Sequence, residues 1–181
     1  MKHVVDTPRL ILREMSLGDL DFIAAMMADP EVMRYYPKCY SRDEAHSWVE
    51  RQMNRYTQHG HGLWLVSEKA NGQRVGQVGL IMQNVRGVEE IEVGYLIHRP
   101  FWRRAYATEA ALACRDYAFD VLGRQQVISL IRPENGPSQG VAMKLGMTPE
   151  SCRIQHGSFE HMVFSISRMA WQNDWPPRKG L

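Results

Sequence analysis

The sequence predicts an α/β protein of mixed type, with one domain built on a twisted, mostly antiparallel sheet of about seven strands and about four flanking helices. Three observations support this fold class. The chain has 181 residues, of which 44% are hydrophobic and 23% charged, and this composition suits a single globular domain. Short apolar runs joined by turn residues fill its middle third, as in antiparallel hairpins. A long helical pattern then lies between two apolar runs, as in a βαβ unit.

The expected element order is β-α-α-β-β-β-α-β-α-β-β. Residues 10–12, after Pro8, are predicted to form a first short strand. Ser16 then precedes apolar residues at helical spacing. That helix should end before Pro30, because the residue before a proline avoids the helical region.

The second helix should begin after Ser41. Its side chain can accept a hydrogen bond from the third helical N–H while Glu44 reaches back, which is a capping box. This helix is expected to end near His59 and Gly60.

Three strands are expected next, at residues 63–66, 75–82 and 91–97. Asn71 and Gly72 form a strong turn signal between the first two of them. The alanine-rich segment 105–122 is then predicted to be the most clearly helical segment of the chain.

The last third should begin with a buried strand at residues 127–131. The turn 133–138 leads into a helix that ends near Gly146. Two final strands fit residues 148–156 and 159–168. We expect a domain that covers residues 1–174 and a loosely held C-terminal tail, 175–181, which contains two consecutive prolines.

Composition excludes several classes of protein. The 22 Lys and Arg residues against 20 Asp and Glu give a formal charge of only +2, too little to indicate nucleic-acid binding. No apolar run reaches the ~18 residues that span a bilayer, and the N-terminus lacks the apolar core of a signal peptide. Cys39, Cys114 and Cys152 lie far apart, which argues against a disulfide framework and a structural zinc site. We therefore expect a cytoplasmic protein without a metal, and interpret His59 and His61 as loop residues.

Two segments combine a strand end with a helix start, where free N–H groups and the helix dipole favour anions. In the first, Ala105 and Ala107 would let a ligand approach the backbone, and Arg103 and Arg104 add positive charge. An ordinary helix start with solvated arginines is the alternative. The second segment begins at Asn135. Both junctions should lie at the same edge of the sheet, where ligands bind in α/β folds.

These segments belong to a set of six motifs in a characteristic order. The chain resembles the GNAT acetyltransferases and, within them, the branch named for the ribosomal-protein N-terminal acetyltransferases RimJ and RimL. The motifs that carry the resemblance lie at residues 7–13, 29–35, 76–80, 91–95, 102–110, and 135–138 with 144–146.

The resemblance implies direct acetyl transfer from acetyl-CoA to a primary amine, either a protein N-terminus or a small molecule, without an acyl-enzyme. It also implies a set of cofactor-binding residues. The pyrophosphate should be held by the loop that contains Arg103, Arg104, Ala105, Tyr106, Ala107 and Thr108, and the pantetheine arm by the backbone of Tyr95, Leu96 and Ile97 and the side chain of Asn135. Ser138 should lie near the thioester sulfur.

The chain departs from the family pattern at three positions. The loop usually carries glycines where this sequence has Arg103 and Ala105. Alanine costs little there unless the loop needs a positive φ. The tyrosine that protonates the leaving thiolate elsewhere in the superfamily is replaced by Ala142, which makes Ser138 the candidate acid or sulfur contact. A non-catalytic acyl-CoA-binding or regulatory module that keeps the fold is therefore the alternative function.

The reaction also needs a base, because a lysine-like amine with a pKa of ~10.4 must lose a proton before it attacks. Glu92, on the strand beside the thioester, is the first candidate, and Glu90 on the same face is the reserve. The alternative for both is a solvated glutamate on an open sheet face. The acceptor, and the choice between a monomer and a homodimer, stay open.

Overall fold

One eight-stranded sheet organises the chain. In the computed structural model, which describes residues 2–174, the strand order is β1-β2-β3-β4-β5-β6-β8-β7, and only the β5–β6 pair is parallel. The strands are β1 (His3–Asp6), β2 (Leu10–Arg13), β3 (Leu63–Glu68), β4 (Arg74–Val85), β5 (Val88–Ile97), β6 (Gln126–Ile131), β7 (Thr148–His156) and β8 (Phe159–Ser167). The helices are α1 (Leu20–Ala28), α2 (Arg42–His59), α3 (Tyr106–Asp120), α4 (Gly136–Lys144) and α5 (Arg168–Asp174).

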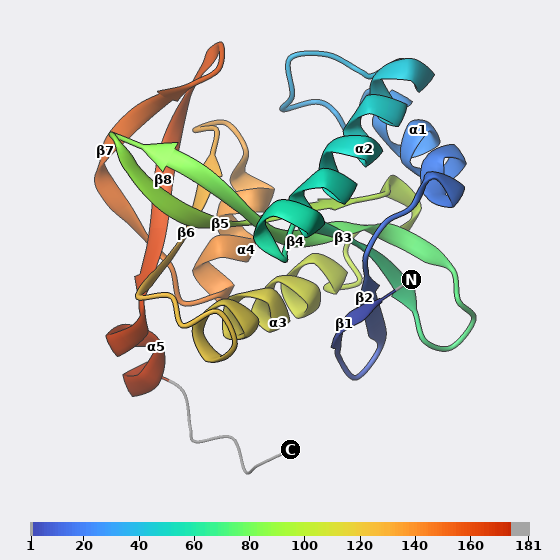
Figure 1. Cartoon of the computed structure of the whole chain (residues 1–181). Coiled ribbons are helices and arrows are strands. Elements are labelled where there is room, and N and C mark those ends of the chain that lie inside the picture. Colours follow the sequence, from blue (N-terminus) through green and yellow to red (C-terminus); the bar gives the residue numbers. More distant parts are fainter. Residues whose placement is uncertain (1, 175–181) are drawn as a thin grey trace.

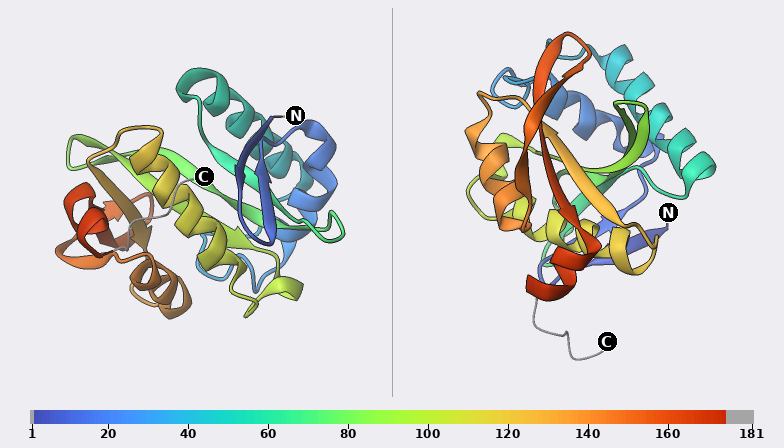
Figure 2. Two further views of the ribbon diagram at one scale, coloured as in Figure 1. Left: turned by 90° about the horizontal axis from the view of Figure 1, so that it is seen from below. Right: turned by 90° about the vertical axis from the view of Figure 1, so that its left-hand side faces the viewer.

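The helices cover both faces of this sheet. Helices α1 and α2 lie on one face, and α3 and α4 lie on the other (Figures 1 and 2). Side chains alternate along each strand, so that Leu63 and Leu65 of β3 pack under α1 and α2 while Trp64 and Val66 pack against the α3 layer. The sheet therefore separates two apolar cores.

The predicted fold class is confirmed, and the structure adds two elements to it. Strand β1 pairs with β2, and α5 follows β8. Neither was predicted; β1 has four residues and α5 has seven. The predicted tail at 175–181 lies outside the described residues.

Local signals explain the main helix and turn positions. The capping box forms at Ser41 and Glu44, and α2 ends at Gly60, whose φ is 73°. Asn71 and Gly72 lie in the β3–β4 connection as expected. The tight two-residue turn is instead Arg86-Gly87 between β4 and β5, with φ values of 53° and 84°.

The parallel β5–β6 pair shapes the site. Among the described residues its only register pair is Glu92 with Ile128. Beyond that pair β6 continues its ladder with β8, while the last residues of β5 remain paired with β4 alone. The two strands therefore separate, and the β6-facing edge of β5 is left without a strand partner. Within residues 2–174, no helix combines the length and apolar character that a membrane span needs.

Candidate functional site

The loop before α3 has the backbone geometry of an anion-binding turn. Arg103 and Ala105 both have φ of 61°, and Ala105 is the N-cap of α3. The first helical hydrogen bond runs from the Glu109 N–H to the Ala105 carbonyl at 2.9 Å, so the N–H groups of residues 106–108 have no helical acceptor. These groups and the positive end of the helix dipole can receive a phosphate.

The positive φ values meet the condition under which alanine is costly at residue 105. The left-handed conformation of Ala105 disfavours any side chain with a Cβ, by ~1–2 kcal/mol. The same holds for Arg103. The loop thus keeps the conformation that glycines adopt freely while carrying two residues that resist it.

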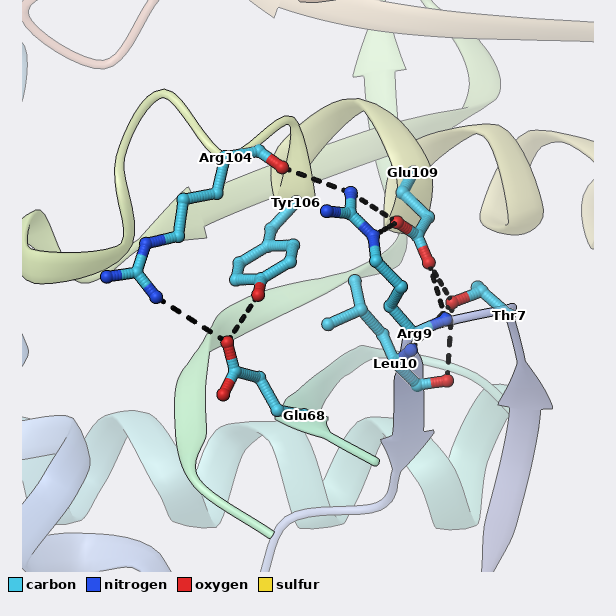
Figure 3. Close-up of polar contacts among 7 residues, drawn as sticks. All are labelled: Thr7, Arg9, Leu10, Glu68, Arg104, Tyr106 and Glu109. Atoms are coloured by element: carbon cyan, nitrogen blue, oxygen red, sulfur yellow. Dashed lines mark hydrogen bonds and ion pairs between the residues drawn. The ribbon is translucent and has the colours of Figure 1, made fainter. Parts of the chain in front are cut away.

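Side chains from distant parts of the sequence hold this loop (Figure 3). Arg9 donates from Nε to Glu109 at 2.6 Å and from its guanidinium to the Arg104 carbonyl at 3.0 Å. Tyr106 donates its hydroxyl proton to Glu68. Arg9, Glu68 and Glu109 were not predicted as site residues. Residues 7–13 and 102–110 were both recognised as motifs, but no sequence signal links them, and nothing in the sequence singles out Glu68.

The exposed edge of β5 lies next to this loop. The His98 N–H bonds to the Val75 carbonyl at 2.9 Å, so antiparallel alternation directs the main-chain groups of Leu96 to β4 and those of Tyr95 and Ile97 to the gap. The indole N–H of Trp102 donates a hydrogen bond to the Ile97 carbonyl at 2.6 Å. The Tyr95 N–H and C=O and the Ile97 N–H therefore face the gap, whereas Leu96, named with them from the sequence, is committed to the sheet.

Asn135, Ser138 and Tyr95 meet at the start of α4. Asn135 caps the helix by accepting the Ser138 N–H at 3.1 Å. The Tyr95 hydroxyl donates to the Ser138 carbonyl at 2.8 Å and accepts from Ser138 Oγ at 3.1 Å. Burial raises the pKa of Tyr95 to about 12, so its hydroxyl stays protonated at physiological pH. The contact between Tyr95 and Ser138 was missed from the sequence because 43 residues separate them.

Glu92 is buried rather than solvated, with 9% of the residue exposed. It accepts hydrogen bonds from Gln83 Nε2 at 2.6 Å and from the Leu130 N–H at 3.2 Å. Burial raises its pKa, and these bonds oppose that shift in part. Glu92 thus occupies the gap between β5 and β6, and the alternative of an open, solvated position is wrong for this residue.

Glu90 lies in different surroundings. Burial and the negative charge of Glu150 raise its pKa, and the positive charge of Arg124 lowers it in part. Glu90 also lines a surface hollow with Val88 and Glu150, next to the turn at Gly87. This position beside the hairpin end makes Glu90 a poorer candidate than Glu92.

The aromatic residues divide between core and surface. Trp64 is fully buried and meets Tyr117 edge to face, so it is part of the core and cannot line a cleft. Tyr36 is 40% exposed and lies in the connection between α1 and α2, the helices that cover the Glu92 side of the sheet. Arg132 donates to the Tyr35 carbonyl at 3.4 Å and lies 3.9 Å from the centre of the Phe159 ring. It thereby joins the loop before α2 to the β7–β8 hairpin.

Only one of the two histidines interpreted as loop residues lies in a loop, because His59 is the last residue of α2. His61 is buried, and its Nδ1 lies 2.9 Å from the Leu80 carbonyl. In the part of the chain that the structure describes, no three His, Cys, Asp or Glu side chains are grouped so as to hold a metal ion.

The chain is similar in sequence to a known protein family and to several curated proteins. A model of the "Acetyltransferase (GNAT) domain" family matches residues 9–148. Among curated relatives, the Bacillus subtilis "Uncharacterized protein YkkB" is 34% identical over 142 residues, 78% of this chain and 83% of that protein. The Bacillus subtilis "Uncharacterized N-acetyltransferase YoaA" is 26% identical over 160 residues, 86% of this chain and 89% of that protein.

Solved structures share the fold over most of the chain. An acetyltransferase from Agrobacterium tumefaciens has a TM-score of 0.79 and 26% identity, with 91% of this chain and 94% of that one covered. The ribosomal L7/L12 alpha-N-protein acetyltransferase RimL, solved with coenzyme A, has a TM-score of 0.74 at 11% identity, with 92% and 98% covered. At 11% identity, the likeness to RimL shows a shared fold alone.

Proposed function

Since the chain belongs to the GNAT acetyltransferase family, we propose that it is an N-acetyltransferase that moves an acetyl group from acetyl-CoA directly to a primary amine. Membership of this family makes the protein an acyltransferase. The observation that carries the proposal is the turn at residues 103–108, which keeps the left-handed geometry and the free N–H groups of an anion site. We also propose a cytoplasmic location, which fits the sparse cysteines of the chain.

The donor site is proposed to extend from this turn along β5. The N–H groups from Arg104 to Thr108 would hold the pyrophosphate. The main chain of Tyr95 and Ile97 would pair with the amide groups of the pantetheine arm, as an added strand does. The Asn135 side-chain NH2 can donate to the same arm, since its oxygen serves the helix cap.

Two side chains would move protons. Glu92 accepts a proton from the incoming ammonium, directly or through water, so that the amine nitrogen can attack the acetyl carbon. The carbon–sulfur bond breaks as the new amide forms, and the second proton that the nitrogen loses balances the one that the leaving thiolate takes up to become the free thiol of CoA. Ser138 Oγ, which donates its one hydroxyl proton to Tyr95 in the structure, is proposed to turn that proton to the sulfur, while the bond from the Tyr95 hydroxyl to the Ser138 carbonyl holds the residue in place. No cysteine takes part.

The acceptor is proposed to be a primary amine of either class, a protein N-terminus or a small molecule. It would approach on the face of the sheet that carries Glu92, α1 and α2, opposite the α3 and α4 face that carries the donor turn. Tyr36 and Arg132 would border its path.

The altered loop sequence and the alanine at residue 142 favour a second function, a non-catalytic acyl-CoA-binding module. Two measurements separate it from the enzyme. Calorimetric titration with acetyl-CoA and with CoA should give a micromolar Kd, about −8 kcal/mol. Thiol release should then be followed with short peptides that have a free N-terminus and with small diamines.

One variant tests whether the turn is the donor site. Ala107→Trp should block the approach of a phosphate to the first turn of α3 and weaken acetyl-CoA binding at least about tenfold. Val121→Trp, at the exposed far end of the same helix, is the matched control and should bind normally. Binding without thiol release from any amine would favour the non-catalytic module. Absence of binding to the wild-type protein would refute the donor assignment.

A further inference from the structure

The turn at residues 103–108 contains a conformational problem that the structure must solve. Arg103 and Ala105 both hold φ of 61° without being glycine. Residues in such conformations persist only where their surroundings determine them from several sides. Residues 102–105 are exposed, so core packing around their side chains cannot hold this part of the turn.

The first set of contacts comes from the turn between β1 and β2. One oxygen of Glu109 accepts the Thr7 hydroxyl at 2.6 Å and the Arg9 N–H at 2.9 Å, and the other accepts Arg9 Nε at 2.6 Å. The Arg9 guanidinium also donates to the Arg104 carbonyl at 3.0 Å and lies 4.7 Å from the centre of the Tyr106 ring. Arg9 therefore contacts the loop on both sides of Ala105.

The second set of contacts comes from the end of β3. Glu68 accepts the hydroxyl of Tyr106 and lies 3.8 Å from the guanidinium of Arg104, while Asn71 donates to its other oxygen at 2.8 Å. Figure 3 shows the two sets converging on the loop from the same side. Arg104 lies between the two residues with positive φ. The contacts of its carbonyl and its guanidinium therefore restrain the backbone of the turn.

From this arrangement we infer that Arg9 is a positioning residue for the donor site, which with Glu109 and Glu68 holds the non-glycine turn in the conformation that binds pyrophosphate. The inference rests on the proposed function. It assigns to the β1–β2 hairpin a role in donor affinity, although that hairpin lies outside the turn itself. In this chain, side-chain contacts replace the conformational freedom of the two glycines.

The consequence is a change in population rather than a lost ligand contact. When the binding-competent conformation of a site is only fractionally populated, the observed affinity for the ligand is reduced by that fraction. Arg9→Ala should lower the population of the binding-competent conformation of the turn. It should therefore weaken the binding of acetyl-CoA and of CoA alike by about tenfold. Arg9→Lys should resemble Arg9→Ala, because lysine lacks the guanidinium fork.

A double-mutant cycle separates this role from a direct contact to the ligand. Arg9→Ala is made in the wild-type chain and in a chain that carries Arg103→Gly and Ala105→Gly. Because glycine enters the left-handed region freely, Arg9→Ala should weaken CoA binding by less than about threefold in the glycine chain. Glu109→Gln serves as a second, milder variant in both chains. Arg42→Ala, which breaks the exposed ion pair with Asp21, is the control and should leave CoA affinity unchanged in both.

Equal loss of affinity in both chains would overturn the inference, because Arg9 would then act on the ligand directly. Unchanged affinity in the wild-type chain would overturn it as well. Hydrogen exchange of the segment 99–110 without ligand gives a further test that does not depend on acetyl-CoA. Arg9→Ala should accelerate exchange there several-fold and leave the segment 42–59 unchanged. If the wild-type protein binds no acetyl-CoA, the donor assignment fails, and unaltered exchange in Arg9→Ala would then refute the positioning role separately.

Discussion

Glu92 and Tyr95 show how burial sets the chemistry of single residues in this protein. Both belong to β5, and for both, burial is the largest cause of a raised pKa. The effects differ. A raised pKa makes a carboxylate a better proton acceptor, whereas it makes a phenol a poorer proton donor. Glu92 can therefore accept a proton more readily than an exposed glutamate, whereas Tyr95 serves as a neutral hydrogen-bond partner.

Replacing Glu92 with Gln should lower kcat by about 10²–10⁴-fold, because the amine loses its proton acceptor. In the wild-type enzyme the rate should fall on the acid side with a midpoint above 4.5, the ordinary pKa of glutamate, since burial raises this pKa. That acid limb should be absent from the variant, and acetyl-CoA affinity should be unchanged. A pH–rate profile with the same acid limb in both proteins would remove Glu92 from the mechanism.

Replacing Tyr95 with Phe removes the hydroxyl that orients Ser138. A single neutral hydrogen bond contributes ~1 kcal/mol, so kcat should fall about fivefold. The shape of the pH–rate profile should stay the same up to about pH 10, because the pKa of Tyr95 is about 12. Tyr117→Phe, whose ring meets Trp64 in the core, is the control. If Tyr95→Phe and Ser138→Ala had fully additive effects on kcat, the two residues would not act as a unit.

Among the secondary-structure elements, β4 contributes most to the arrangement of the site, because it lies between β3 and the open strand β5. Its motif at residues 76–80 was recognised from the sequence, and the structure gives the physical reason for its glycines. A Cβ on Gly79 would lie 2.1 Å from the Gly62 carbonyl oxygen, and one on Gly76 would lie 2.4 Å from the Leu96 carbonyl oxygen. Close approach of backbones, rather than a turn, requires glycine at both positions.

Gly79→Ala should therefore destabilise the fold by about 3 kcal/mol or more, because the clash is with the backbone of Gly62 and Leu63 at the start of β3. Denaturant unfolding measures this change. Gly140→Ala is the matched control, since a Cβ at that position in α4 meets nothing within 4 Å, and it should stabilise the protein by about 0.5–1 kcal/mol. Equal stability of the two variants would contradict the close approach at Gly79.

At the scale of the whole molecule, a buried aspartate with two arginine partners joins distant segments. Asp19, before α1, forms ion pairs with Arg13 of β2 at 2.7 Å and Arg74 of β4 at 3.2 Å. Burial alone would raise the pKa of Asp19, but hydrogen bonds from Arg13 and Ser16 and the two arginine charges lower it. Folding therefore favours the ionised form, and stability should depend on pH through this group.

The sign of that dependence follows from the lowered pKa. The contribution of Asp19 is fully present above 3.8, its ordinary pKa, and is lost as pH falls through the lower value in the folded protein. Asp19→Asn should cost at least about 2 kcal/mol at pH 7, and the difference from the wild type should shrink below pH 4. Asp21→Asn, in an exposed ion pair with Arg42, should cost less than about 0.5 kcal/mol. A cost for Asp19→Asn that stays constant between pH 7 and pH 3 would contradict this linkage.

The sequence alone was sufficient for the features that depend on near neighbours in the chain. The capping box at Ser41 and the periodicity of α3 arise from contacts within a few residues, and they helped to predict the fold class, while the order of the motifs along the chain carried the resemblance to the family. The candidate residues on α3, α4 and β5 were named from that resemblance, and their roles stay predictions.

Only the tertiary structure decided how those residues are held. Arg9 and Glu109 are 100 residues apart, and Tyr95 and Ser138 are 43 apart, so no local pattern could pair them. The burial of Glu92 depends on where β5 and β6 separate, and the positive φ of Ala105 depends on the path the chain takes between β5 and α3. Short-range preferences select elements, whereas packing of distant segments sets the dihedral angles, the burial and the pKa values on which the proposed chemistry depends.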